Sequence, residues 1–250
     1  MHSILDRLYP AQNRFTIRVE NMKLNTTDFL HLSEEERSEI VLLKGHMKFG
    51  LHNYMPGDVE YITFLRKPLH RIVSYYYYVL RTPAHKLYQH LNDTNMTLHD
   101  FVTKIREKDL HNGQIRMISG IDDKEGLMLE KAFENIHNHF SFVGITERFN
   151  ESLVLLSKRY GWSSPYYRKL NTTTKQPNVY DHKTVQAIEY LNNGDNILYD
   201  TMNESLNKML GNDLSHHIKF FKLVVLNMLY SNALIQTLGR GIRRLSIPTK

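Results

Sequence analysis

Arg66 and Ser74 are the residues whose types and spacing best suit the binding of a phosphate group. Arg66 follows a short β-branched and aromatic run, and Ser74 comes later in a run with helical periodicity. A guanidinium donates two parallel hydrogen bonds to a phosphate, and a neighbouring hydroxyl adds a third. The pair therefore predicts an anion site. The alternative is an exposed arginine and an ordinary helix serine.

The segment Glu60–Tyr78 predicts the strand–turn–helix unit that would position both side chains. Tyr61–Leu65 has the composition of a buried strand. Pro68 fixes φ where a helix can begin, and apolar residues then recur at helical spacing. Because Arg66 stands at the carboxyl end of the strand, it is expected at the edge where parallel sheets bind ligands.

His46 is the best candidate for a general base. It follows the apolar run Ile40–Leu43 and Gly45, a residue that lets the backbone approach a ligand closely. An imidazole is also partly deprotonated near neutral pH. Lys44 and Lys48 flank His46 and are candidates for stabilising negative charge during catalysis. A lysine near a strand end is equally well explained as a solvated side chain.

The spacing Arg-x-Pro-x-x-Arg-x-x-Ser-x-Tyr-Tyr that begins at Arg66 resembles a motif of sulfotransferases that use 3′-phosphoadenosine 5′-phosphosulfate. The resemblance is strongest to carbohydrate O-sulfotransferases similar to heparan sulfate 2-O-sulfotransferase. It implies that Arg66 and Ser74 hold the 3′-phosphate of this co-substrate. It also implies that His46, in its Gly-His-x-x-Phe-Gly context, is the base toward a carbohydrate hydroxyl.

Two further segments resemble the same family. Asn112, Gln114 and Arg116 belong to a segment of the form Asn-x-Gln-x-Arg-x-x-x-Gly, which the resemblance places on the acceptor side. A helix that packs its isoleucines inward is an equal alternative. Lys169 and Lys175 lie in a polar, basic loop, and the resemblance implies that this loop closes over the nucleotide.

The resemblance departs from the family at the 5′-phosphosulfate loop. The family pattern Pro-Lys-x-x-Gly-Thr/Ser-Thr/Ser is not found in this sequence, and neither is a Walker A motif. Two interpretations stay open. Either the reading frame extends upstream into such a loop, or the chain is a non-catalytic relative that binds a nucleotide or an acidic glycan. A nucleotide kinase is a weaker third alternative, because it needs the same loop.

The order of apolar and polar segments predicts an α/β fold. Short strands alternate with helices, which is typical of a mostly parallel sheet, and the C-terminal half is predicted to be helical. With the resemblance, the expectation is a P-loop-NTPase-like sulfotransferase fold. Ser33 followed by Glu36 predicts a capping box. The strands are predicted at 14–19, 40–43, 61–65 and 141–146, and the helices at 3–10, 84–91, 98–110, 130–139, 147–160 and 181–209.

Length and composition favour one domain over residues 1–250, with a C-terminal amphipathic helix and basic tail over 213–250. The net charge of +6 suits an anionic nucleotide or glycan, and no nucleic-acid-binding motif accompanies it. Cysteine is absent, which fits a reducing, cytoplasmic location. The Golgi lumen is the alternative if an N-terminal anchor has been lost. Polar residues interrupt the apolar segment 220–238, so no transmembrane segment is expected.

Histidine is abundant but gives no metal-site pattern. His137 and His139 lie two apart in a predicted helix and so face different directions, and no carboxylate or third histidine stands near at metal-ligand spacing. No metal is expected. His52 is a further candidate for contacting the substrate. The acceptor sugar, the hydroxyl modified and the oligomeric state stay open, including a homo-oligomer.

Overall fold

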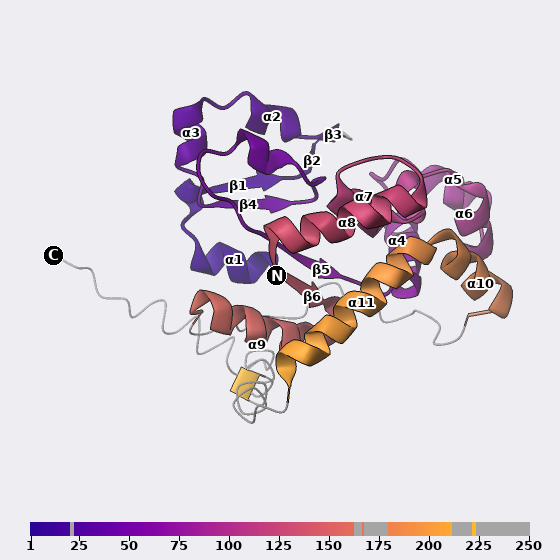
Figure 1. Ribbon diagram of the computed structural model, residues 1–250. Coiled ribbons are helices and arrows are strands. Elements are labelled where there is room, and N and C mark those ends of the chain that lie inside the picture. The colour runs from indigo at the N-terminus through magenta and orange to yellow at the C-terminus, as the bar shows by residue number, and fades with distance from the viewer. Residues whose placement is uncertain (21–22, 163–166, 168–179, 212–221, 224–250) are drawn as a thin grey trace, which may run out of the picture.

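Two parallel strand pairs organise the molecule (Figure 1). The computed structural model describes residues 1–20, 23–162, 167, 180–211 and 222–223. The strands are β1 (Arg14–Ile17), β2 (Val19–Glu20), β3 (Lys23–Leu24), β4 (Leu42–Gly45), β5 (Tyr61–Leu65) and β6 (Phe140–Ile145). The α-helices are α1 (His2–Leu8), α2 (Thr26–Leu30), α3 (Glu34–Ser38), α4 (Pro68–Leu80), α5 (Tyr88–Asp93), α6 (Leu98–Lys104), α7 (Gly113–Ser119), α8 (Glu125–His139), α9 (Phe149–Tyr160), α10 (His182–Leu191) and α11 (Asn193–Leu210). Short 3-10 helices are η1 (Ala11–Asn13), η2 (Leu51–Tyr54), η3 (Lys108–Leu110) and η4 (Thr146–Arg148).

The strands confirm a mixed α/β fold but not one continuous sheet. β1 pairs with β4 and β5 pairs with β6, both in parallel, while β2 and β3 form an antiparallel pair. Among the described residues these are three separate two-stranded sheets. The predicted parallel pairing is therefore confirmed, but the described strands do not join into one central sheet, because β4 and β5 form no ladder with each other. P-loop-like detail stays a prediction.

The β5–α4 unit forms as the sequence predicts. β5 has the predicted bounds, and α4 begins at Pro68 in the first helical position, where the missing N–H costs no hydrogen bond. The helix buries one face through Ile72, Val73 and Val79. Arg66 and Lys67 form the short connection between strand and helix.

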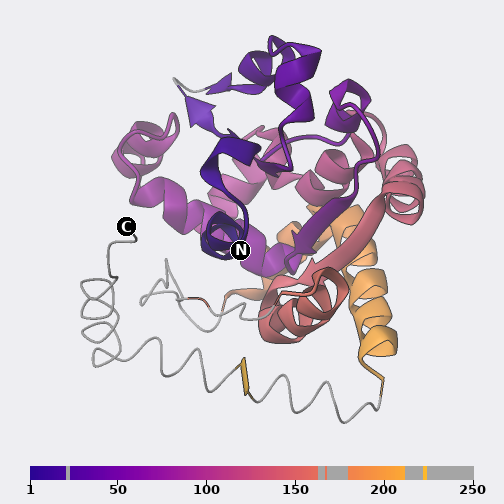
Figure 2. The same ribbon diagram turned by 90° about the vertical axis from the view of Figure 1, so that its left-hand side faces the viewer.

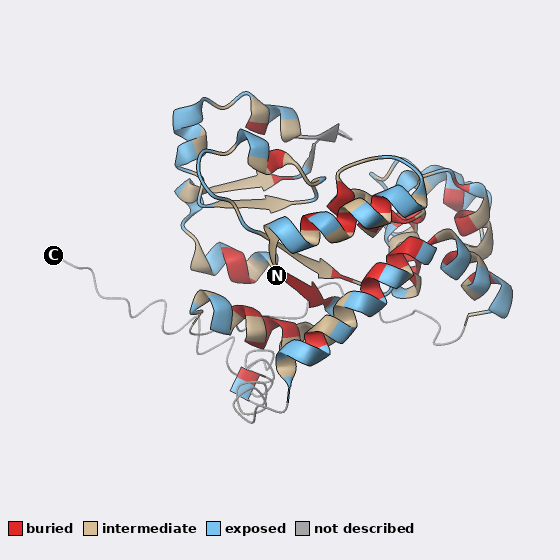
Figure 3. Cartoon of the chain, in the orientation of Figure 1, coloured by how far each residue is buried: buried red, intermediate tan, exposed pale blue. Residues whose placement is uncertain are grey.

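The largest core cluster surrounds the end of β6. Buried residues of β6 pack with residues from α8, α9 and α11, and the burial colours in Figure 3 show this concentration on β6 and on the helix faces turned toward it. Figure 2 shows the same arrangement from the side, with β1, β4, α2 and α3 on one side of β5 and β6 and α9 on the other. These helices hold the carboxyl end of β6 in place.

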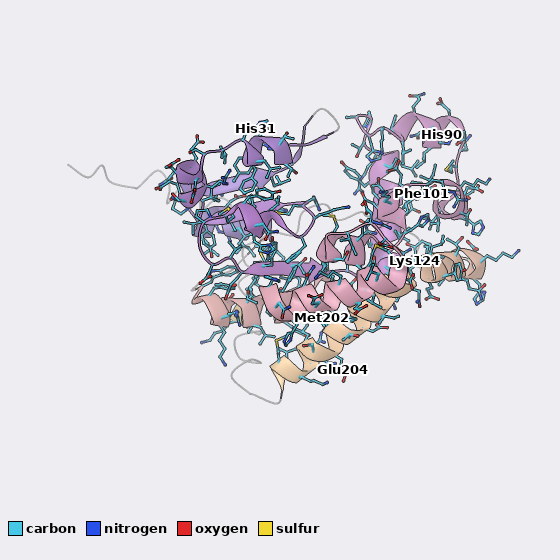
Figure 4. The ribbon with its side chains drawn as sticks, turned by 45° about the horizontal axis from the view of Figure 1, so that its top comes forward. His31, His90, Phe101, Lys124, Met202 and Glu204 are labelled. Carbon is cyan, nitrogen blue, oxygen red and sulfur yellow. The ribbon has the colours of Figure 1, made fainter. Side chains whose placement is uncertain are left out.

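A second cluster joins α4 with α5, α6 and α10. Phe101 on α6 is fully buried there, and Figure 4 labels it. The same figure labels Met202 and Glu204 on α11. Met202 packs against the first cluster, whereas Glu204 is exposed and pairs with Lys208 at 3.1 Å. Helix α11 thus has one apolar face and one charged face.

Several local predictions are confirmed and some boundaries change. Ser33 and Glu36 form the predicted capping box at the start of α3. The helix predicted over 98–110 ends at Lys104, and a separate 3-10 turn follows at Lys108–Leu110. The helix predicted over 84–91 begins later, at Tyr88. The C-terminal helix and basic tail predicted over 213–250 lie outside the described residues, apart from 222–223. Within the described ranges, no helix is long and apolar enough to cross a membrane.

Candidate functional site

Arg66 stands directly beyond the last rung of the β5–β6 ladder, where Leu65 pairs with Ile145. Its side chain is partly buried, and it forms no hydrogen bond or ion pair with any described residue. Burial lowers the pKa of Arg66, while the negative charge of Glu147 opposes that shift. The structure therefore presents a partly desolvated guanidinium that no described carboxylate pairs with, which is a favourable arrangement for an anionic ligand.

The backbone of Arg66 is held by the side chain of Gln114. Gln114 Oε1 accepts from the Arg66 N–H at 2.8 Å, and Gln114 Nε2 donates to the Arg66 carbonyl at 2.9 Å. This pair of bonds continues the strand ladder by one residue, with an amide side chain in place of a neighbouring strand. Gln114 was predicted on the acceptor side. In the structure its side-chain amide binds the backbone of Arg66. A contact between Gln114 and the acceptor carbohydrate stays a prediction.

Glu147 joins the end of β6 to the start of α4. Its Oε1 accepts from the Lys67 N–H at 3.1 Å and lies 3.0 Å from His70 Nδ1. The Tyr199 hydroxyl donates to Glu147 Oε2 at 3.3 Å, and burial, reinforced by this carboxylate, raises the pKa of Tyr199 to about 12. Glu147 was not among the site residues predicted from the sequence. Its position directly after a predicted buried strand was the available signal.

Ser74 lies in the middle of α4 and is partly buried. It follows His70 by four residues and Arg71 by three, so these side chains share a helix face. Both of these earlier residues belong to the first turn of α4, near Arg66. Within the described part of the chain the Ser74 hydroxyl makes no hydrogen bond. A joint phosphate site of Arg66 and Ser74 is compatible with this placement and stays a prediction.

His46 is exposed and begins the connection that leaves β4. Gly45 precedes it with φ of +139°, and a Cβ there would lie 1.9 Å from the Ile17 carbonyl oxygen. Only glycine fits this close approach of the paired strands β1 and β4. Three residues after His46, the Phe49 N–H donates to the Met117 carbonyl of α7 at 2.8 Å. The backbone thus carries His46 from the end of β4 toward α7.

Lys44 is paired with a carboxylate rather than free. Its side chain is only 9% exposed, and its ammonium group contacts Asp6 of α1, which also pairs with Arg14. The hydrogen bond from Lys44 lowers the pKa of Asp6. Burial first and repulsion by Lys44 second lower the pKa of His2, and His46 adds to this repulsion. Positive groups therefore gather where β4 ends.

Lys48 and Arg116 meet at Asp122. Lys48 Nζ lies 2.8 Å from Asp122 Oδ2, Arg116 donates to Asp122 Oδ1 at 2.8 Å, and Lys108 Nζ lies 2.9 Å from Oδ2. These hydrogen bonds, that from Lys48 first, hold the pKa of Asp122 far below its usual range. Three cations around one carboxylate leave an excess of positive charge. The predicted roles of Lys48 and Arg116 toward ligands stay predictions.

His52 lies beside the amino end of β5. Its Nδ1 is 3.0 Å from the Tyr61 hydroxyl, and its ring centroid is 4.7 Å from that of His139. Burial and the neighbouring His139 lower the pKa of His52. Arg66 lies five positions after Tyr61, a distance of about 16 Å along the strand. The structure therefore does not bring His52 to Arg66.

The remaining predicted residues are buried or undescribed. Asn112 is buried, and its Nδ2 donates to Glu125 Oε2 at 2.6 Å. It therefore belongs to a network inside the protein, and its acceptor role stays a prediction. Lys169 and Lys175 lie outside the described residues. In the ranges that the structure describes, no group of three or more His, Asp or Glu side chains is arranged to hold a metal ion.

The fold and this geometry define a mixed α/β domain with a partly buried cation at the end of a parallel strand, the edge at which α/β proteins bind ligands. The profile of the galactose-3-O-sulfotransferase family matches residues 20–218, well over half of the chain. The chain belongs to this family, which is a family of carbohydrate sulfotransferases. No curated protein gives a significant match. The resemblance to carbohydrate sulfotransferases inferred from sequence is thus confirmed at the level of the family.

Proposed function

We propose that the chain transfers a sulfuryl group from 3′-phosphoadenosine 5′-phosphosulfate to a hydroxyl of a galactose-containing carbohydrate. The observation that carries the proposal is the Arg66 guanidinium, which is partly buried and unpaired among the described residues while its backbone is fixed by Gln114. A desolvated cation is costly unless an anion binds to it. Family membership supports the reaction class.

Arg66 and Ser74 bind the 3′-phosphate of the nucleotide in this proposal. The guanidinium donates two parallel hydrogen bonds to phosphate oxygens, and the hydroxyl donates one more. These contacts position the co-substrate without reacting. Orientation of this kind converts an encounter of two ligands into a reaction within one complex.

His46 acts as the general base. Its neutral ring accepts the proton of the acceptor hydroxyl while that oxygen forms a bond to sulfur. The bond between sulfur and the bridging phosphate oxygen breaks, and adenosine 3′,5′-bisphosphate leaves with the electron pair. Positive charge near the end of β4, including Lys44 and Lys48, favours the negative charge that develops on the transferring group. The positive charge of each lysine is partly neutralised by a carboxylate, that of Asp6 for Lys44 and that of Asp122 for Lys48.

The test is the affinity for adenosine 3′,5′-bisphosphate, measured by titration calorimetry. We expect the wild-type chain to bind this nucleotide. The affinity of Arg66→Ala should be lower by roughly tenfold or more, because hydrogen bonds to a charged group are lost. Arg106→Ala is the matched control, since Arg106 is exposed between α6 and η3. No binding by the wild-type chain would reject the site.

The second candidate function is that of a binding protein without catalytic activity. The predicted cationic partners of the sulfuryl group, Lys44 and Lys48, are already paired with Asp6 and Asp122. This observation favours a chain that binds the nucleotide, or an acidic glycan, without turnover. Transfer of labelled sulfate to a galactoside establishes the enzyme. Nucleotide binding without such transfer establishes the binding protein.

A further inference from the structure

Asp195 is a fully buried carboxylate in the first turn of α11. Its two oxygens accept from two successive backbone donors at the start of α7: Oδ2 from the Gln114 N–H at 3.0 Å and Oδ1 from the Ile115 N–H at 2.8 Å. A charged group at this depth is retained only where it is hydrogen-bonded on every side. No sequence motif predicts a role for Asp195.

The start of α7 needs this outside partner. The N-terminal N–H groups of a helix have no acceptors within the helix, and Asn112, the N-cap residue, has left-handed φ of 52° and provides no side-chain cap. Asp195 supplies the cap from a helix about eighty residues away in sequence. In return, Asn112 Oδ1 accepts from the Asp195 N–H at 3.0 Å.

The reciprocal bonds lock the two helix starts together. Asn192 completes the lock, because its Oδ1 accepts from the Asn112 N–H at 3.0 Å and its Nδ2 donates to the Leu110 carbonyl at 3.0 Å. Gly194 lies against this junction, where an added Cβ would be 2.6 Å from Ile115 Cδ1. The backbone of Gln114 is therefore fixed by several independent contacts.

Gln114 connects this lock to Arg66. Its backbone is bound by Asp195, and its side-chain amide is bound to both polar groups of the Arg66 peptide, at 2.8 and 2.9 Å. Arg66 has no later ladder partner of its own, because the β5–β6 pairing ends at Leu65. The Gln114 amide thus fixes the backbone of Arg66, and with it the position of the Arg66 Cα from which the side chain extends.

We propose that Asp195 is a positioning residue for the anion site: it holds Gln114, and through Gln114 it aims the Arg66 guanidinium at the 3′-phosphate. This inference rests on the proposed function. Two-point recognition of a phosphate by arginine depends on orientation, and sites of this kind require supporting contacts that hold the binding group to within about half an ångström.

A carboxylate suits this role better than an amide. Asp195 faces two donors and offers an acceptor to each, whereas an asparagine would point its NH₂ group at one of them. Arg71 supports the charged form, since its positive charge lowers the pKa of Asp195 against the larger, raising effect of burial. Arg71 also packs over Gly113, where an added Cβ would lie 2.3 Å from its Nη2.

The experiment measures the preference for the 3′-phosphate. For each variant, titration calorimetry gives the ratio of the Kd for adenosine 5′-monophosphate to that for adenosine 3′,5′-bisphosphate, and Arg66→Ala sets the baseline. We expect Gln114→Ala to lower the ratio by about tenfold and Asp195→Asn to lower it severalfold, with the Kd for adenosine 5′-monophosphate unchanged. Gln114→Ala in the Arg66→Ala background should change the ratio no further.

Asp181→Ala is the control for a loss of stability alone. Asp181 caps α10, with its Oδ1 accepting from the Thr184 N–H at 2.9 Å, and it has no contact with Gln114. It should lower the melting temperature and leave the ratio intact. A high wild-type ratio that survives both Gln114→Ala and Asp195→Asn overturns this inference alone. A wild-type ratio near one overturns the proposed 3′-phosphate site as well.

Discussion

The Arg66 connection and the His46 connection both leave the carboxyl end of a parallel strand, yet they are built in opposite ways. At Arg66, a side chain of α7 binds the backbone, and the guanidinium has no described partner. At His46, the backbone is fixed by Gly45 and by the bond from Phe49 to Met117, while the neighbouring lysines are paired with carboxylates.

The difference fits the two roles proposed for these residues, nucleotide binding at Arg66 and proton transfer at His46. A side chain that binds an anion at a fixed position benefits from a rigid backbone and from the absence of a carboxylate that competes for it. A base that must approach and leave an acceptor hydroxyl benefits from exposure, and its surroundings need only a favourable field. We therefore expect substitutions at Arg66 to change affinity and substitutions at His46 to change rate.

Of the substitutions that test this comparison, His46→Ala should have the largest effect, a loss of turnover. We expect kcat for sulfuryl transfer to a galactoside to fall by about a hundredfold or more, because a general base contributes on that scale. The Kd for adenosine 3′,5′-bisphosphate should stay at the wild-type value, opposite to the pattern for Arg66→Ala. His90→Ala is the control, an exposed histidine on α5 (Figure 4). Unchanged turnover in His46→Ala would remove His46 from the chemistry.

Gly45→Ala tests the backbone side of the comparison. Its Cβ would meet the Ile17 carbonyl oxygen at 1.9 Å with φ of +139°, so we expect a loss of about 3 kcal/mol and a melting temperature roughly 10 °C lower. Gly50→Ala is the control, because Gly50 also has positive φ, +123°, but no atom within 4 Å of the added Cβ. Equal destabilisation by both changes would show that backbone strain, and not the clash with the paired strand β1, is responsible.

Asp122→Asn should give the smallest effect, and its sign depends on pH. The pKa of Asp122 is lowered in the folded protein, so its contribution is present at neutral pH and is lost as the pH falls below the ordinary aspartate range, about 4. With solvent screening we expect about 1 kcal/mol at pH 7. Urea unfolding from pH 7 to 3 should show the gap between wild type and variant begin to narrow below pH 4 without closing, because the pKa of Asp122 in the folded protein lies well below that range. Asp123→Asn, whose Oδ1 only accepts from the next N–H, is the control. An equal loss of stability in Asp123→Asn at pH 7 would contradict the ion-pair explanation.

Local features of the fold were predictable because short-range physics decides them. The bounds of β5, the start of α4 at Pro68 and the capping box at Ser33 all follow from residue types and near neighbours. The candidate site was predictable only as a set of residues. Arg66 and His46 were found by their place after apolar runs, which marks strand ends in any α/β chain.

Contacts between distant segments could not be predicted in the same way. Nothing in the spacing of Asp195 or Asn192 indicates that they meet Asn112 and Gln114, some eighty residues earlier. The pairing of Lys44 with Asp6 likewise needs α1 to lie across the end of β4. A single sequence carries no signal for which of many carboxylates and amides will meet.

The sequence by itself determined the family, the strand–turn–helix around Arg66 and the candidate base, because motif spacing and hydrophobic period are properties of the chain. The tertiary structure decided which cations are free to act. Lys44 and Lys48 are paired with carboxylates, whereas Arg66 is held by Gln114 and Asp195 with its guanidinium unpaired among the described residues. The physical reason is that a charge is free or neutralised according to its neighbours in space, and those neighbours come from distant parts of the chain.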